Sequence, residues 1–211
     1  MKKILSVLCI SCLLTLSACA SKTSPEIVPP PPENAKVSEK TPTKEDMMKK
    51  WMEYSTPGAE HKVLNRFVGK WDYTVKFWMD PSAAPQVSKG KAEYRWVFGG
   101  RYLEQNVKGK SMGQLFEGKG IMAYDKATNK YRSVWYDSMG TGLMIGSGLF
   151  DSQSGTLTEA GSSSCPIKGT IPYRFVTTFK DKNHFTSEMF MENPHTGVEM
   201  KGMQLDYSRG K

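Results

Sequence analysis

The feature that most constrains this sequence is an alternation of apolar and polar side chains that begins directly after Gly69. Apolar side chains at every second position lie on one face of a β-strand, because successive residues point to opposite faces. In the first segment Trp71, Tyr73, Val75 and Phe77 alternate with Asp72, Thr74 and Lys76. Residues rich in Gly, Asn, Asp and Ser separate the later segments and predict turns. Further strands are predicted at residues 90–98, 101–108, 117–124, 130–137, 142–150, 155–161, 171–180, 183–191 and 198–208.

Short strands at regular spacing, without helices between them, favour an antiparallel meander. A flat sheet of about ten strands would leave two edges of unpaired backbone groups, whereas closure into an up-and-down barrel removes both. A barrel somewhat larger than eight strands has room inside for a small ligand. We therefore expect an all-β protein in which residues 61–211 form an antiparallel up-and-down barrel of about ten strands. A sandwich of two sheets is the alternative.

The first eighteen residues have the pattern of an export signal. Lys2 and Lys3 precede an apolar run at residues 4–16, which is too short to span a bilayer. Residues 16–19, Leu-Ser-Ala-Cys, resemble the lipobox of bacterial lipoproteins. That resemblance implies cleavage before Cys19, a diacylglycerol on its sulfur and a membrane as partner through this anchor. Ala20 is typical of outer-membrane residence facing the periplasm in a Gram-negative cell. An ordinary secretory signal is the alternative.

Residues 19–42 are predicted to be a proline-rich linker, because they include four consecutive prolines and few apolar side chains. Residues 43–60 then predict an amphipathic helix. Thr43 and Asp46 have the spacing of a capping box, and Met47, Trp51 and Tyr54 follow at helical spacing. We expect this apolar stripe to pack on the barrel, since a short isolated helix is marginal in water. The alternative is a helix on a membrane surface, favoured by nearby lysines.

Charge and cysteine content exclude some functions. The chain carries a formal charge of +8, but its basic residues alternate with acidic ones instead of forming a dense run. We therefore expect no nucleic-acid partner. Cys9 and Cys12 lie in the signal and Cys19 would carry lipid, which leaves Cys165. The barrel is therefore expected to be stable without an internal disulfide.

Gly69 and Trp71 resemble the Gly-x-Trp motif of lipocalins and other calycins. In those barrels the tryptophan closes one end and packs against a basic residue of the last strand, which implies Arg209 as its partner here. A longer set of motifs resembles the bacterial family named domain of unknown function 1579, which is grouped with the calycins. This resemblance implies a calycin-like barrel and no established activity. The motifs are Pro57-Gly58-x-x-His61, residues 99–104, Met112-Gly113, Phe116-Glu117-Gly118, Tyr124-Asp125, residues 135–142 and Tyr207-x-Arg209.

Candidate ligand-binding residues lie on the predicted strands. Trp135 and Asp137 share one face with Ser133, which places an aromatic ring and a polar contact in the barrel interior. Asp137 has a structural alternative as the cap of the following turn. Arg101 and Glu104 fall on opposite faces. An inward arginine would anchor a carboxylate or phosphate, whereas an outward one would be a surface charge, and the sequence leaves both alternatives open. The predicted ligand-binding set is Trp96, Arg101, Glu104, Tyr124, Trp135 and Asp137.

Standard catalytic and metal-binding patterns are not found in the sequence. The three histidines have no metal-ligand spacing, and there is no nucleophile elbow or phosphate-binding loop. We expect no metal, no cofactor and no catalytic residue, although His184 on a late strand keeps haem binding open. The function favoured is an envelope lipoprotein that binds a small apolar or amphipathic ligand without enzymatic activity. The alternatives are an enzyme with a site in the barrel interior and a ligand-free interaction scaffold.

Overall fold

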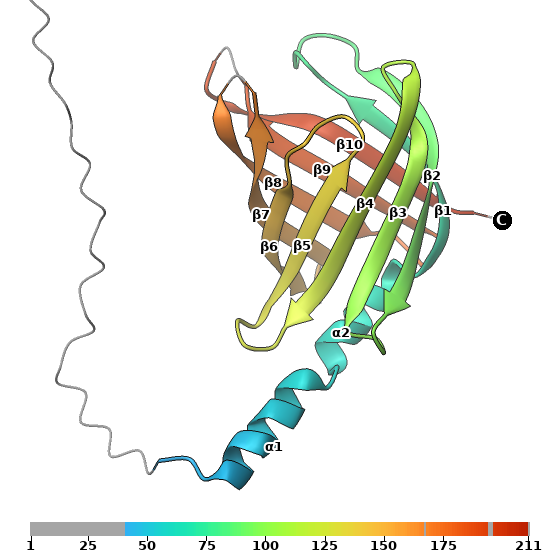
Figure 1. The fold of residues 1–211 in the computed structure, drawn as a ribbon. Coiled ribbons are helices and arrows are strands. Elements are labelled where there is room, and N and C mark those ends of the chain that lie inside the picture. The colour runs from blue at the N-terminus through green and yellow to red at the C-terminus, as the bar shows by residue number, and fades with distance from the viewer. Residues whose placement is uncertain (1–40, 167, 194–195, 211) are drawn as a thin grey trace, which may run out of the picture. The chain divides into compact units, whose positions relative to one another are not determined.

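The computed structural model describes residues 41–166, 168–193 and 196–210, so the predicted signal peptide, Cys19 and nearly all of the predicted linker lie outside the described residues. Ten antiparallel strands form a closed barrel in which each strand pairs with its neighbours in sequence (Figure 1). This confirms the predicted all-β up-and-down barrel and excludes the two-sheet sandwich. The strands are β1 (Gly69–Phe77), β2 (Gln86–Val97), β3 (Tyr102–Ser111), β4 (Gln114–Asp125), β5 (Lys130–Asp137), β6 (Met144–Asp151), β7 (Thr156–Cys165), β8 (Gly169–Phe179), β9 (His184–Glu192) and β10 (Glu199–Arg209).

The barrel closes where β1 pairs with β10. The register runs from Trp71 opposite Arg209 to Phe77 opposite Met203. Because β1 also pairs with β2 along its length, both of its edges are used and no open edge remains. A register shift between Lys201 and Met203 interrupts the pairing of β10 with β9 and bends the last strand.

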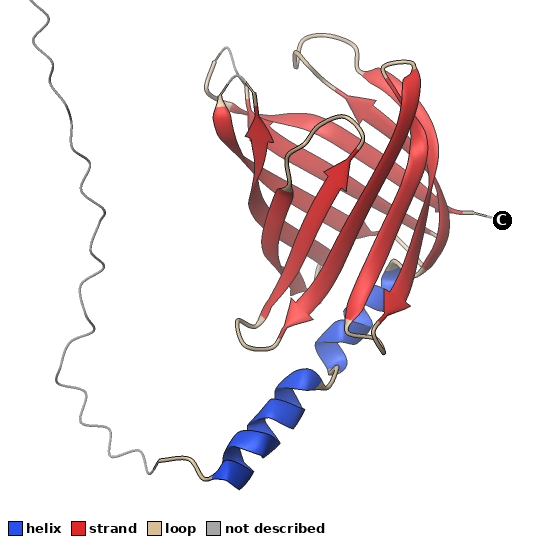
Figure 2. Ribbon diagram, viewed as in Figure 1, coloured by secondary structure: helices blue, strands red, loops and turns tan. Residues whose placement is uncertain are grey.

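Two short helices lead directly into the barrel at the end where β1 begins (Figure 2). They are α2 (Ala59–Val63) and the single-turn helix η1 (Leu64–Arg66). The backbone N–H of Gly58 donates to Nδ1 of His61, which caps α2. Leu64 is fully buried and Phe67 is 3% exposed, while Tyr131 of β5 donates to the carbonyl of Glu60. This segment therefore plugs one end of the barrel.

The preceding helix α1 (Lys44–Ser55) has the predicted capping box, but the predicted packing of its apolar stripe on the barrel is wrong. Trp51 is 65% exposed and no residue of α1 is buried. Its contacts with the barrel include hydrogen bonds from Lys126 to the carbonyls of Glu53 and Thr56. The segment α2–η1, and not α1, supplies the buried side chains at this end of the barrel. Among the described helices, none is long and apolar enough to cross a membrane.

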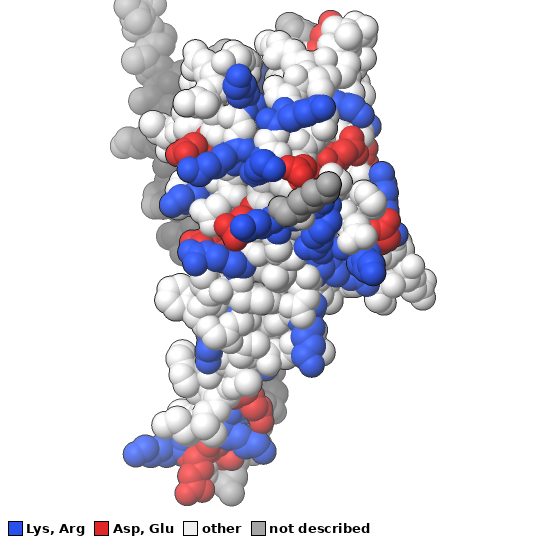
Figure 3. All heavy atoms as spheres, turned by 90° about the vertical axis from the view of Figure 1, so that its right-hand side faces the viewer, with Lys and Arg blue, Asp and Glu red and all other residues white. Residues whose placement is uncertain are grey.

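The outer face of the barrel is charged in both signs (Figure 3). Ion pairs connect neighbouring strands, as between Lys91 and Asp72 at 2.8 Å. They are exposed and contribute at most about 1 kcal/mol each. The apolar residues that alternate with these charged residues along the strands therefore point inward and form the core.

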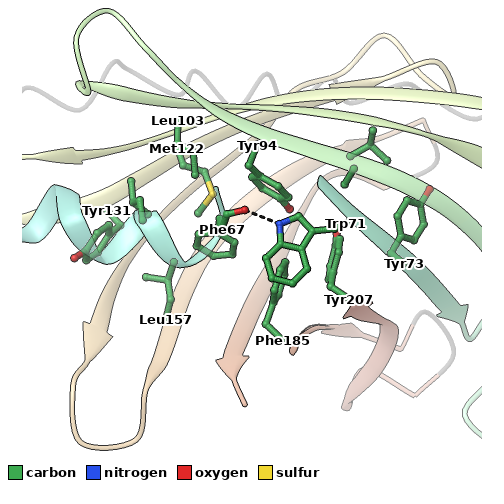
Figure 4. Packing of buried hydrophobic residues seen from close by; sticks show 13 residues of the cluster. Phe67, Trp71, Tyr73, Tyr94, Leu103, Met122, Tyr131, Leu157, Phe185 and Tyr207 are labelled. Carbon is green, nitrogen blue, oxygen red and sulfur yellow. Dashed lines mark hydrogen bonds between the residues drawn. The ribbon is translucent and has the colours of Figure 1, made fainter. Parts of the chain in front are cut away.

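Trp71 is the centre of the packed end of the barrel (Figure 4). It is 1% exposed, and its indole N–H donates to the carbonyl of Phe67 at 2.6 Å. Phe185 meets the indole edge-on at 4.7 Å between ring centroids and stacks on Tyr207 at 4.2 Å. These contacts join the plug to strands from both sides of the closure.

Arg209 covers Trp71 from the last strand, which is the contact that the sequence led us to expect. Its guanidinium carbon lies 3.8 Å from the centre of the indole ring. The same guanidinium donates to the carbonyls of Val68 and Lys182. Gly69 has a φ of +120°, and a Cβ there would lie 2.5 Å from Nη1 of Arg209. The glycine of the Gly-x-Trp motif is therefore needed for the guanidinium to reach the indole.

We expect Trp71→Ala to lower the free energy of unfolding by about 3–5 kcal/mol, because it removes a buried ring and leaves a cavity. Chemical denaturation followed by circular dichroism measures this loss. Trp51→Ala is the matched control, since its exposed ring should change stability by no more than about 0.5 kcal/mol. An equal loss in both variants would contradict the structure, because it would mean that α1 packs on the barrel.

Candidate functional site

A cavity of about 410 Å³ lies inside the barrel. It extends from Phe67, at the plugged end, to Met112 and Met139 in the turns at the other end. Met112 is 65% exposed, so the turn end is open to solvent. Most of the wall is apolar and aromatic, with a few polar groups. A volume and lining of this kind are typical of sites for small molecules.

The sequence prediction placed Trp135 and Asp137 in the barrel interior, and the structure puts both in the cavity wall. The indole N–H of Trp135 donates to Oδ2 of Asp137 at 2.9 Å. Oδ1 accepts from the backbone N–H of Met139 at 2.9 Å, which is the alternative role as a turn cap. Asp137 therefore lines the cavity and also caps the turn, and each of its two carboxylate oxygens accepts a hydrogen bond within the protein.

Glycines make room for the aromatic rings of the wall. A Cβ at Gly118 would collide with the indole of Trp135, and a Cβ at Gly161 would lie 2.7 Å from the ring and the hydroxyl of Tyr173. These rings lie over the backbone of neighbouring strands instead of projecting across the interior. The large side chains therefore line the cavity without filling it.

Glu159 is a buried carboxyl group in the cavity wall that the sequence analysis missed. It is 7% exposed, and its Oε1 has no hydrogen-bond partner among the described residues. A Cβ at Gly146 would lie 2.6 Å from Ser133 Oγ, 3.0 Å from Tyr173 Oη and 3.5 Å from Glu159 Oε1. Three polar groups from β5, β7 and β8 therefore converge beside Gly146.

The pKa values of this cluster follow from burial. Desolvation raises the pKa of Glu159, and the nearby Ser133 hydroxyl partly offsets this effect. Desolvation raises the pKa of Tyr173 to about 12, with a further contribution from the charge of Glu159. Both shifts favour the neutral, protonated form of each group.

Other polar side chains of the wall have partners within the protein. Gln105 donates to the hydroxyl of Tyr94 at 2.7 Å, and the hydroxyls of Thr177 and Ser187 lie 2.8 Å apart. Burial raises the pKa of Tyr94 and of Tyr207. Glu159 is therefore the acidic group of the wall whose hydrogen-bonding capacity is left unused in the described structure.

Arg101 and Glu104 do not line the cavity, which corrects the predicted polar anchor. Arg101 is exposed in the turn after β2, where it donates to the carbonyl of Phe98 at 3.0 Å. Glu104 points outward and pairs with Arg95 at 2.6 Å. The inward position of this strand belongs to Leu103, which is fully buried, because the register of β3 is set by its apolar face.

Trp96 and Tyr124 also lie away from the cavity, at the plugged end. The indole of Trp96 donates to Asn65 at 2.7 Å, and the ring of Tyr124 packs on Tyr131 at 5.0 Å. His184, the residue that kept haem binding open, is 2.9 Å from Asp181 in an exposed turn. Within the described ranges no group of three metal-binding side chains occurs.

One sequence signal could have identified Glu159. Leu157, Glu159 and Gly161 share one face of β7, so the alternation places an acidic residue where a buried one is expected. The run of small residues at 160–164 in this strand and the two glycines of β6 weaken the alternation and hid the signal.

Glu159→Gln should stabilise the protein at neutral pH. Because burial raises the pKa of Glu159 above its ordinary value of 4.5, the folded state binds its proton more tightly than the unfolded state. The free energy of unfolding therefore falls as pH rises above 4.5, by up to about 1.4 kcal/mol per pH unit. The fall ends once the pH has passed the pKa of Glu159 in the folded state. The stability advantage of the variant should be absent in acid and grow over this interval, as measured by unfolding at a series of pH values.

Glu104→Gln is the control with the opposite sign. Hydrogen bonds from Arg95 and Asn106 lower the pKa of Glu104 in the folded state. The contribution of Glu104 to stability is therefore present above its pKa in the unfolded chain and is lost in acid. This variant should be less stable than the parent at neutral pH, and the difference should shrink at low pH. A parallel pH dependence of the two variants would contradict the assignment of Glu159 as a buried, unpaired carboxyl.

Two solved structures of low sequence identity are similar to this chain, and the one with a TM-score of 0.55 shares its fold. Rv2717c from M. tuberculosis is similar over all of its own chain and 74% of this one, with 12% identity and a TM-score of 0.55. The S-type phycobiliprotein lyase CPES from Guillardia theta covers 73% of this chain and 94% of its own, with 11% identity and a TM-score of 0.49. No curated protein sequence matches. The model of the family described as "Protein of unknown function (DUF1579)" matches residues 56–209, and this chain therefore belongs to the DUF1579 family.

Proposed function

We propose that this protein binds a small apolar or amphipathic molecule inside the barrel. The observation that carries the proposal is the cavity of about 410 Å³, which is plugged at one end, open at the other and lined mainly by apolar and aromatic side chains. Transfer of an apolar ligand from water to this wall is favourable by about 25 cal/mol for each Å² buried. The few polar groups of the wall would then orient the ligand.

The two alternatives fit the cavity less well. A scaffold that works only through its outer surface would be expected to fill its interior with side chains, since unfilled volume forfeits packing contacts. An enzyme is favoured by the convergence of Ser133, Glu159 and Tyr173 beside Gly146. Because any such reaction first needs a substrate in the cavity, binding is the function that both the volume and the polar cluster support.

The N-terminal sequence supports an envelope location, which we include in the proposal. Residues 16–19 have the lipobox pattern, and Cys19 would carry the lipid that anchors the protein. The exposed Met47, Trp51 and Tyr54 of α1 favour the alternative of a helix on the membrane surface, since they are not covered by the barrel. Binding would then take place at the periplasmic face of the outer membrane in a Gram-negative cell.

Ligand uptake is tested with Nile red, whose fluorescence rises in an apolar environment, added to the full chain. Met144 lines the cavity, whereas the next residue, Ile145, is 48% exposed on the outer face of the same strand. Met144→Trp should block the cavity and reduce dye uptake at least about tenfold. Ile145→Trp adds the same ring outside and should leave uptake unchanged. Failure of the parent chain to bind the dye, or an equal loss in both variants, would refute binding in the cavity.

Anchoring is tested separately with Cys19→Ser. Without the sulfur no diacylglycerol can be attached, so we expect the variant to leave the membrane fraction or to remain as an uncleaved precursor. Fractionation and mass determination of the N-terminus measure both outcomes. Membrane association of a fully processed Cys19→Ser protein would contradict lipid anchoring.

A further inference from the structure

The charged groups of the cavity wall lie at different depths. Lys110 and Asp137 lie close to the open end, at the ends of β3 and β5. Glu159 lies three residues from the start of β7, in the half of the barrel nearer the plug. A ligand that enters from the open end therefore meets both signs of charge first and a single carboxyl group deeper inside.

The surroundings of Glu159 contain no positive charge in the described structure. The groups that face it are the hydroxyls of Ser133 and Tyr173 and the backbone around Gly146 and Gly148. No lysine, arginine or histidine forms an ion pair or hydrogen bond with it in the described part of the chain. Burying a carboxylate without such a partner costs free energy. A ligand with a positive charge would supply the partner that the protein does not provide.

We propose that Glu159 anchors a ligand that carries a positively charged amine on an apolar chain. An ammonium group offers hydrogen-bond donors for Oε1, which has no partner among the described residues, and a positive charge that favours the ionised carboxylate over the protonated form. Apolar residues nearer the open end, such as Phe116 and Trp135, would cover the chain of the ligand. An alcohol would supply only the hydrogen bond, and a carboxylate would be repelled. This inference rests on the proposed function and specifies its ligand class.

Three probes of equal chain length test the inference: decylamine and decanoate below their critical micelle concentrations, and decanol below its solubility limit. Calorimetric titration of the full chain at neutral pH should show decylamine binding at least about tenfold more tightly than the other two. In Glu159→Gln this preference should disappear, while the affinity for decanol should stay unchanged. Glu104→Gln makes the same substitution on the outer face and should keep the amine preference.

The outcomes separate the inference from the proposed function. Equal binding of the three probes, or an amine preference that survives in Glu159→Gln, would overturn the inference while Nile red uptake still supports a ligand-binding cavity. Loss of the preference in Asp137→Asn but not in Glu159→Gln would assign the amine to the open end and would also overturn it. If neither the probes nor Nile red bind the parent chain, the proposed function itself fails.

Discussion

The pairing of the last strand with the first is the constraint on which the rest of this structure depends. Strands β1 and β10 are separated by more than a hundred residues, and their pairing removes the two edges that a ten-stranded sheet would otherwise expose. Trp71 and Arg209 stand opposite each other in this pairing, and the guanidinium lies over the indole. Contacts of this type contribute about 0.5–2 kcal/mol, depending on desolvation. The same arginine holds the carbonyl of Val68, so closure and the plug are joined in one cluster.

The packed end and the hollow end of the barrel have complementary roles. Rings of Phe67, Trp71, Phe185 and Tyr207 fill the plugged half and supply most of the apolar burial. In the other half glycines let Trp135 and Tyr173 lie flat against the wall, so that volume remains open. An open cavity and a buried, unpaired Glu159 both reduce stability. The tightly packed end offsets these costs.

Much of the fold could be predicted from local patterns. The alternation at residues 71–77 and the glycine-containing turns defined the strands, and strand number and antiparallel order led to closure. Site residues were predicted less well. Trp135 and Asp137 were found because they follow strict alternation on one strand, whereas Arg101 and Glu104 were chosen for their chemistry. The register that turned Glu104 outward depends on which face of β3 is buried, and this is decided by the neighbouring strands.

The sequence by itself determined the strands, their turns and the capping box of α1, because each of these depends on spacing along the chain. The partnership of Trp71 with Arg209 was implied by the resemblance to the calycins, since no local spacing connects residues so far apart. Only the tertiary structure decided that α1 stays exposed, because the buried side chains at this end of the barrel come from α2 and η1 instead. It also decided that the barrel is hollow and that Glu159 meets Ser133 and Tyr173 inside it. Those outcomes depend on how β5, β7 and β8 are arranged around one interior. Local patterns in the sequence do not predict that arrangement.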